Sequence, residues 1–230
     1  MTKRLWRGYD NPDAVGCIVA PLCQIKDWVE AFNTDGVMTF DKVGSVHMIA
    51  IDAQGNKANN LGLDDLAKKD NKYKIGRKLN DEDNSVFMLS GDSNNKPLII
   101  CEGLGDALAL HKLYNCYIMT PIGVIGKLAK HSREIVEFLT QFCSSEIWLM
   151  PDNDAGSNLL SRFVQQLKDA GSDILIKSWL LKEKLDTLDP ADVVMYNSER
   201  KAREIFERNL VIEASESVEI GDKEVLELML

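Results

Sequence analysis

Long apolar runs, closely spaced cysteines and an excess of basic charge are all missing from this sequence of 230 residues. No stretch approaches the roughly 18 consecutive apolar residues of a membrane-spanning helix. The N-terminal segment has no signal-peptide core, so we expect a cytoplasmic protein without a membrane segment. Its composition, 45% hydrophobic and 27% charged, is that of an ordinary globular protein with a core of its own.

Cysteine and histidine are too scattered to form a recognisable metal or redox motif. The five cysteines and three histidines include no pair with the spacing of a zinc ribbon, so we expect no zinc site. We interpret the cysteines as reduced, mostly buried, small hydrophobic residues.

Basic residues are outnumbered, and the net charge of −9 argues against nonspecific attraction to DNA. One basic cluster stands against this balance, within the sequence NKYKIGRKL. Its members are Lys72, Lys74, Arg77 and Lys78. By itself the cluster fits a phosphate-binding loop and a solvated charged loop equally well.

The pattern of the chain predicts three segments. Residues 1–95 form a small α+β subdomain, with a helix in CQIKDWVEAF and an antiparallel strand pair around a turn at residues 52–55. The polar connector SGDSNNKP marks the boundary. Residues 96–209 alternate strands and helices, which predicts an α/β fold with a parallel sheet and helices on both faces. Residues 210–230 form an acidic C-terminal tail, either a solvated terminus or a partner-binding helix.

Acidic residues follow three of the predicted strands. They are, in chain order, Glu102 and Asp106, then Asp152 and Asp154, then Asp189 and Asp192. The C-terminal ends of parallel strands meet at one edge of a sheet, where ligands bind. Mg²⁺ prefers oxygen ligands and leaves positions for phosphate oxygens, so such a cluster suits a cation that also holds a phosphate. Each motif alone fits a helix cap as well.

Glycines stand beside these acids or at strand ends, where the backbone must turn sharply or approach a phosphate closely. They are Gly103, Gly123 and Gly156.

The segments IICEGLGDALAL, TPIG, IWLMPDNDAG and LDPADVV, in this order, resemble the Toprim domain of topoisomerases and primases. The similarity is greatest to bacterial-type (DnaG-like) and phage or plasmid primases, and it covers about residues 97–197. The resemblance implies a Toprim-like (Rossmann-like) fold. The preceding region is similar, through less specific motifs, to the small basic subdomain that precedes Toprim in phage and mobile-element primases.

The resemblance also implies roles for particular residues. Glu102 would serve in acid–base chemistry or metal binding, and Asp152 and Asp154 would bind Mg²⁺ or Mn²⁺. The third metal-binding acid would be Asp189, with Asp192 as the alternative. The catalytic set would consist of Glu102, Asp106, Asp152 and Asp154. The basic cluster at residues 72–78 would hold template and nucleotide phosphates.

The implied function is a Mg²⁺-dependent nucleotidyltransferase that makes short RNA primers on single-stranded DNA from ribonucleoside triphosphates, for a phage, plasmid or mobile element. One alternative is a Toprim nuclease that cleaves phosphodiesters with the same carboxylates. Another is a non-catalytic replication accessory protein, whose acidic tail recruits a replicative helicase or another replication protein. Every motif position keeps its carboxylate, which favours an active enzyme.

The sequence departs from these primases in two respects. It contains no Cys/His set for the zinc-binding module that commonly precedes such domains, and no Gly-rich loop with a Lys-Ser/Thr pair as in a helicase motor. We therefore expect either a primase core that depends on partners or a protein other than a primase.

Overall fold

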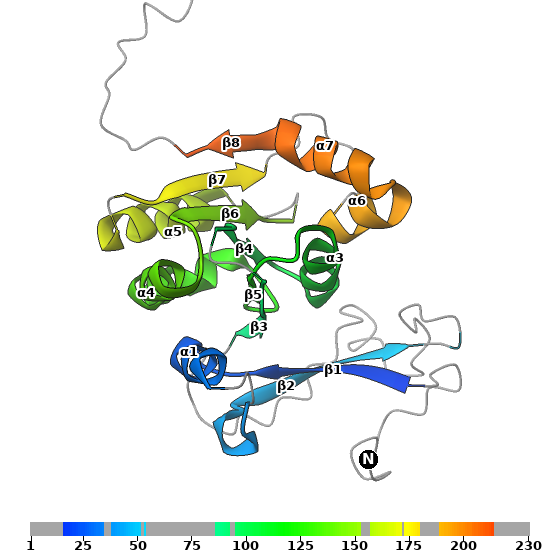
Figure 1. Cartoon of the computed structure of the whole chain (residues 1–230), viewed down its shortest axis with the longest axis vertical. Helices are drawn as coiled ribbons and strands as arrows, with labels where there is room; N and C mark the ends of the chain where they lie inside the picture. Colours follow the sequence, from blue (N-terminus) through cyan, green and yellow to red (C-terminus); the bar gives the residue numbers. More distant parts are fainter. Residues whose placement is uncertain are drawn as a thin grey trace, which may run out of the picture. The chain divides into compact units, whose positions relative to one another are not determined.

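The computed structural model describes residues 16–34, 38–51, 53, 86–92, 95–152, 157–171, 173–179 and 189–213. The chain divides into two compact units, Met1–Phe87 and Met88–Leu230, which are described separately (Figure 1). The connector at residues 90–97 thus falls inside the second unit. The division falls within strand β3 (Phe87–Leu89), which lies at the edge of the six-stranded sheet.

The first unit contains an antiparallel strand pair and one helix. Strands β1 (Gly16–Leu22) and β2 (Ser45–Ile51) pair along their full length, and η2 (Phe40–Lys42) is a short 3-10 helix between them. The expected helix is confirmed as α1 (Ile25–Asn33), whose buried Trp28 donates its indole N–H to the carbonyl of Val86 at 2.8 Å. The partner of β2 is the preceding strand β1, whereas the predicted pairing across residues 52–55 falls largely outside the described residues.

A six-stranded sheet organises the second unit, in the order β3-β5-β4-β6-β7-β8 (Figure 1). Four strands are parallel, as the alternating pattern predicted. They are β4 (Leu98–Cys101), β5 (Ile118–Thr120), β6 (Glu146–Met150) and β7 (Leu175–Trp179). The order places β4 between β5 and β6, so the acid that follows β4 lies near the middle of the sheet edge.

Strand β8 (Leu210–Ile212) was not expected, because its residues were assigned to the acidic tail. It runs antiparallel to β7 and pairs with Lys177–Trp179. Its backbone therefore satisfies the hydrogen-bonding groups of an otherwise open strand, which the polar sequence around it did not indicate. The remaining tail, residues 214–230, lies outside the described residues.

Helices cover both faces of this sheet, as predicted. On one face α3 (Leu104–Tyr114), α6 (Pro190–Tyr196) and α7 (Glu199–Asn209) share a core cluster with Ile99 and Cys101 of β4. The alternate residues Leu98 and Ile100 are also fully buried. On the other side η3 (Ile125–His131), α4 (Ser132–Phe142) and α5 (Ser157–Ala170) pack together. Burial on both faces explains why β4 is wholly apolar.

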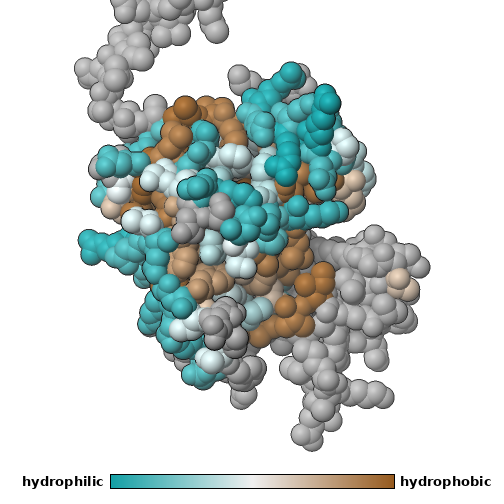
Figure 2. All heavy atoms as spheres, viewed as in Figure 1, coloured by the Kyte–Doolittle hydropathy of each residue, from teal (hydrophilic) through white to brown (hydrophobic). Residues whose placement is uncertain are grey.

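Cysteine burial and surface polarity follow the sequence pattern. Cys23, Cys101 and Cys116 are buried, as expected of small hydrophobic residues. Figure 2 shows hydrophilic side chains over α7, a helix that buries Ala202 and Phe206. No helix within the described ranges is long and apolar enough to span a bilayer.

Candidate functional site

Glu102, directly after β4, is held by the loop that follows the neighbouring strand β5. Its side chain is only 7% exposed. The backbone N–H of Ile125 donates to its carboxylate Oε1 at 3.0 Å. Its carbonyl accepts from the Gly123 N–H at 2.8 Å and from the Thr120 hydroxyl at 3.0 Å. The loop of residues 120–125 therefore orients both the backbone and the carboxylate of Glu102.

This loop adopts unusual backbone geometry. Ile122 has φ +48°, which β-branched residues rarely adopt because their side chain crowds the backbone there, and its N–H donates to the Thr120 hydroxyl at 3.0 Å. Gly123 follows with φ +154°. A strained conformation of this kind costs about 1–3 kcal/mol and persists only where the surroundings impose it. Such strain at the loop that holds Glu102 is consistent with a functional site.

Gly103 is required for space rather than for its φ of −107°, which other residues adopt readily. A Cβ on this residue would lie 2.4 Å from Oδ2 of Asp106. The glycine thus allows the Asp106 carboxylate to fold back onto the start of α3.

Asp106 joins two helices that are distant in sequence. Its Oδ2 accepts a hydrogen bond from the Gly103 N–H at 3.1 Å, and its Oδ1 accepts one from the Ala191 N–H, in the first turn of α6, at 3.0 Å. Burial first, and then the negative charges of Asp189 and Asp152, raise the pKa of Asp106 from 3.8 to about 7. The carboxylate therefore bridges the N-terminal turns of α3 and α6.

Asp189 and Asp192 take different positions in the DPAD sequence. Asp189 is the N-cap of α6, and its Oδ1 accepts the N–H of Asp192 at 2.8 Å. Pro190 occupies the first helical position, where its missing N–H costs nothing. Partial burial and then the charge of Asp189 raise the pKa of Asp192. Asp189 therefore caps the start of α6, and its negative charge is one cause of the raised pKa of Asp106.

Asp152 follows β6 after a single proline and is half-buried. Because β6 pairs with β4 in the register Cys101↔Met150, Glu102 and Asp152 leave adjacent strands at nearly the same level. The pKa of Cys101 is raised far above its usual value by burial and then by the charges of Asp106, Asp152 and Glu102.

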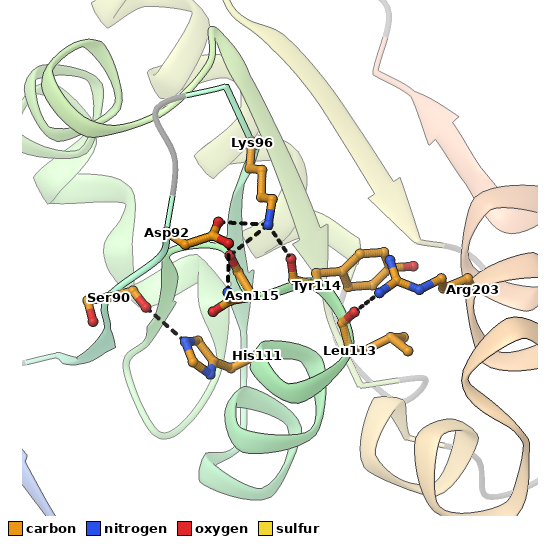
Figure 3. Close-up of polar contacts among 8 residues, drawn as sticks. All are labelled: Ser90, Asp92, Lys96, His111, Leu113, Tyr114, Asn115 and Arg203. Atoms are coloured by element: carbon orange, nitrogen blue, oxygen red, sulfur yellow. Dashed lines mark hydrogen bonds and ion pairs between the residues drawn. The ribbon is translucent and has the colours of Figure 1, made fainter.

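The far end of α3 is anchored to the connector that precedes β4 (Figure 3). Lys96 donates to the carbonyls of Tyr114 and Asn115 at 3.1 Å and pairs with Asp92 at 2.7 Å. Arg203 of α7 donates to the last-turn carbonyl of Leu113 and stacks over the Tyr114 ring. Cations at a helix C-terminus complement its partial negative charge, so α3 is fixed at both ends.

Several predicted site residues lie outside the described residues. They are Asp154, Gly156, Lys72, Lys74, Arg77 and Lys78. Within the described ranges, no three His, Cys, Asp or Glu side chains come together as a metal-binding group. The acids that follow β4 and β6 supply only hard oxygen donors, and a cation would relieve repulsion between them, so they fit Mg²⁺ or Mn²⁺ better than zinc.

Sequence reasoning missed the groups that orient these acids. Thr120, Ile125 and Ala191 act through a hydroxyl or a backbone N–H. Thr120 lies in the TPIG segment and Ala191 in LDPADVV, but neither segment indicated these contacts, because a backbone donor can belong to any residue except proline.

Comparison with known proteins identifies the domain. The sequence model of the Toprim-like family matches residues 99–193. No curated protein matches the chain. Among solved structures, this chain is similar to a chain of one bacteriophage T7 complex. That complex contains lagging-strand DNA polymerase and the primase domains of two gp4 subunits bound to an RNA/DNA hybrid and dTTP. The TM-score is 0.40 at 14% identity, over 83% of this chain and 76% of that chain. On the family match, residues 99–193 form a Toprim-like domain.

Proposed function

We propose that this chain is a primase-type nucleotidyltransferase that makes short RNA primers on single-stranded DNA from ribonucleoside triphosphates. The observation that carries the proposal is that Glu102 and Asp152 follow β4 and β6, which pair in the register Cys101↔Met150, at the strand edge of a Toprim-like domain. Carboxylates brought to one edge repel one another unless one takes up a proton or a cation binds, and phosphate oxygens are natural remaining ligands of such a cation.

The proposed metal-binding residues are Glu102, Asp152, Asp154 and Asp189, with Asp192 as the alternative to Asp189. Bound Mg²⁺ or Mn²⁺ would stabilise the charge that develops on phosphate oxygens during transfer. In the reaction the 3′-hydroxyl of the growing primer attacks the α-phosphate of a nucleotide, and pyrophosphate leaves. Glu102 is held by the Ile125 N–H, and a fixed carboxylate at this place is suited either to accept the hydroxyl proton or to serve as a ligand.

Template and triphosphate would be held by the basic cluster at residues 72–78. With a net charge of −9, the chain needs both this cluster and bound cations to attract a polyanion. The acidic segment after β8 is proposed to contact a replicative helicase or another replication protein.

The test supplies Mg²⁺ or Mn²⁺, single-stranded DNA and labelled ribonucleotides to the full chain. Short labelled products are expected from the wild type and should be abolished by Asp152→Ala and Glu102→Gln. Asp169→Ala is the matched control, because Asp169 is exposed in the last turn of α5, at the end of the helix away from Asp152 and Asp154.

Two other results would contradict this proposal. If the wild type makes no primers but degrades DNA, and Asp152→Ala stops the degradation, the protein is a nuclease. If neither activity occurs and the Asp152→Ala protein still binds a replication partner, the accessory function is correct.

A further inference from the structure

We propose that Asp106 is a positioning residue that sets the place of Asp189 relative to Glu102 by joining the first turns of α3 and α6. This inference deepens the proposed function and rests on it for the roles of Glu102 and Asp189. It departs from the sequence-based expectation that Asp106 belongs to the catalytic set.

The two oxygens of Asp106 are used on two different helices. One accepts the Gly103 N–H, next to Glu102, and the other accepts the Ala191 N–H, two residues after Asp189 and 85 residues away in sequence. Each carboxylate oxygen thus faces one backbone donor. In an amide of the same length, the NH₂ group would replace one of these oxygens and would meet one of the two N–H groups.

The N-terminus of α6 depends on this arrangement. A helix begins with backbone N–H groups that lack partners within the helix. In α6 the first position is Pro190, which has no N–H, the N–H of Ala191 is bound by Asp106, and the N–H of Asp192 is bound by Asp189. Asp106 thus completes the cap that Asp189 begins, and the two helices cannot shift apart without leaving a donor unpaired.

The helices are also shaped for close approach at this point. A Cβ on Gly105 of α3 would lie in ordinary contact with the side chain of Ala191 of α6, at 3.9 Å, so two small residues face each other here. Ala107 of α3 and Val193 of α6 are buried in one core cluster. The hydrogen bond therefore works within a packed contact, which limits how far Asp189 can move.

A direct catalytic role fits Asp106 poorly. Its side chain is only 5% exposed, and both oxygens already accept hydrogen bonds from protein groups. A ligand of a cation or a group that exchanges protons with substrate needs an accessible oxygen. Asp106 instead holds the segments that carry such oxygens.

The first experiment measures amide hydrogen exchange in metal-free protein. Asp106→Asn should raise exchange in the first turn of α6 by about tenfold, because one of the two backbone donors loses its acceptor. Asp106→Glu keeps the charge and both acceptors but displaces them, so it should give the same local effect and serves if the Asn variant fails to fold. Asp169→Asn is the control for the substitution itself. Unchanged exchange in α6 in both Asp106 variants overturns the inference.

The second experiment is a double-mutant cycle of Asp106→Asn and Asp189→Asn, with the Mn²⁺ dissociation constant and the kcat of primer synthesis as readouts. If Asp106 acts through Asp189, Asp106→Asn should weaken Mn²⁺ binding and lower kcat by about tenfold in the wild type, but by less than about twofold once Asp189 is replaced. Asp106→Glu, which keeps the negative charge, should have the same effects on Mn²⁺ binding and kcat as Asp106→Asn. Additive effects overturn the inference. If the wild-type protein neither makes primers nor binds Mn²⁺, the proposed function and the metal-binding role of Asp189 are both overturned. The hydrogen-exchange experiment tests the connection between α3 and α6 independently of that result.

Discussion

Replacing Thr120 with valine should remove hydrogen bonds from the loop that holds Glu102 and destabilise it. The two side chains have nearly the same shape, and Thr120 is fully buried, so the change removes the hydroxyl and little else. The hydroxyl donates to the Glu102 carbonyl and accepts the Ile122 N–H, both at 3.0 Å. The carbonyl keeps its bond from Gly123, whereas the Ile122 N–H loses its acceptor within a buried residue.

The expected loss of stability follows from these contacts. A lost buried hydrogen bond costs about 1 kcal/mol, and an unpaired buried donor about 1–3 kcal/mol, so the free energy of unfolding should fall by about 2–4 kcal/mol. Relaxation of the strained backbone at Ile122 would reduce this cost but would displace Glu102. We therefore expect primer synthesis to fall further than stability alone explains.

The assay is urea-dependent hydrogen exchange of peptides from β4 and β5, which reports the unfolding of this unit alone. Thr120→Ser is the matched control, because it keeps the hydroxyl and loses one methyl group. The valine variant should be less stable than the serine variant and less active at equal folded fraction. If the serine variant is the more damaged of the two, packing rather than hydrogen bonding holds this loop, and the reasoning fails.

Three further perturbations test other parts of the unit. Gly126→Ala should lower the free energy of unfolding by about 1–3 kcal/mol, because the new Cβ would lie 2.6 Å from the Cβ and 2.9 Å from the carbonyl oxygen of Leu159. The loss should be measured as a lower melting temperature. An unchanged melting temperature would contradict the close contact of η3 and α5. Arg203→Lys should lower the free energy of unfolding in urea by about 1–2 kcal/mol, since lysine cannot both cap α3 and stack as a planar group on Tyr114. Equal stability of the two proteins would show that the positive charge alone is sufficient. The pKa of about 7 keeps a proton on Asp106 in the folded, metal-free protein between about pH 4 and 7, where the unfolded chain has released it. The free energy of unfolding should therefore fall as the pH rises through this window, by up to about 1.4 kcal/mol per pH unit, and identical pH profiles for wild type and Asp106→Asn would refute this.

Local patterns in the sequence predicted much of the second unit. Burial leaves a local pattern in the sequence, seen as short apolar runs at residues 98–101 and 146–150 and as amphipathic helices between them. The structure has the expected parallel strands at these two runs. Because the ends of these strands could be recognised in the sequence, so could the acids that follow them. A parallel sheet brings its strand ends to one edge, so the sequence predicted that Glu102 and Asp152 lie at the same edge. That β4 and β6 are direct neighbours was decided by the tertiary structure.

The pairing of distant segments could not be predicted in this way. Strand β8 joins the sheet through backbone hydrogen bonds to β7, and β3 joins it from before the expected boundary, although neither has a strong local signal. Edge strands this short contribute few side chains to the core, so their sequences carry little of the hydrophobic periodicity that marks a strand.

The sequence by itself determined which residue types meet at the strand edge: carboxylates after apolar strands, with glycines that leave room for them. Only the tertiary structure decided how each acid is used. Asp106 and Asp189 are both acids in helix-starting motifs, yet one bonds across 85 residues to the backbone of α6 and the other caps that helix from within. That difference depends on backbone N–H groups brought close by helix packing, and since nearly every residue carries such a group, no side-chain pattern records which of them will be donors.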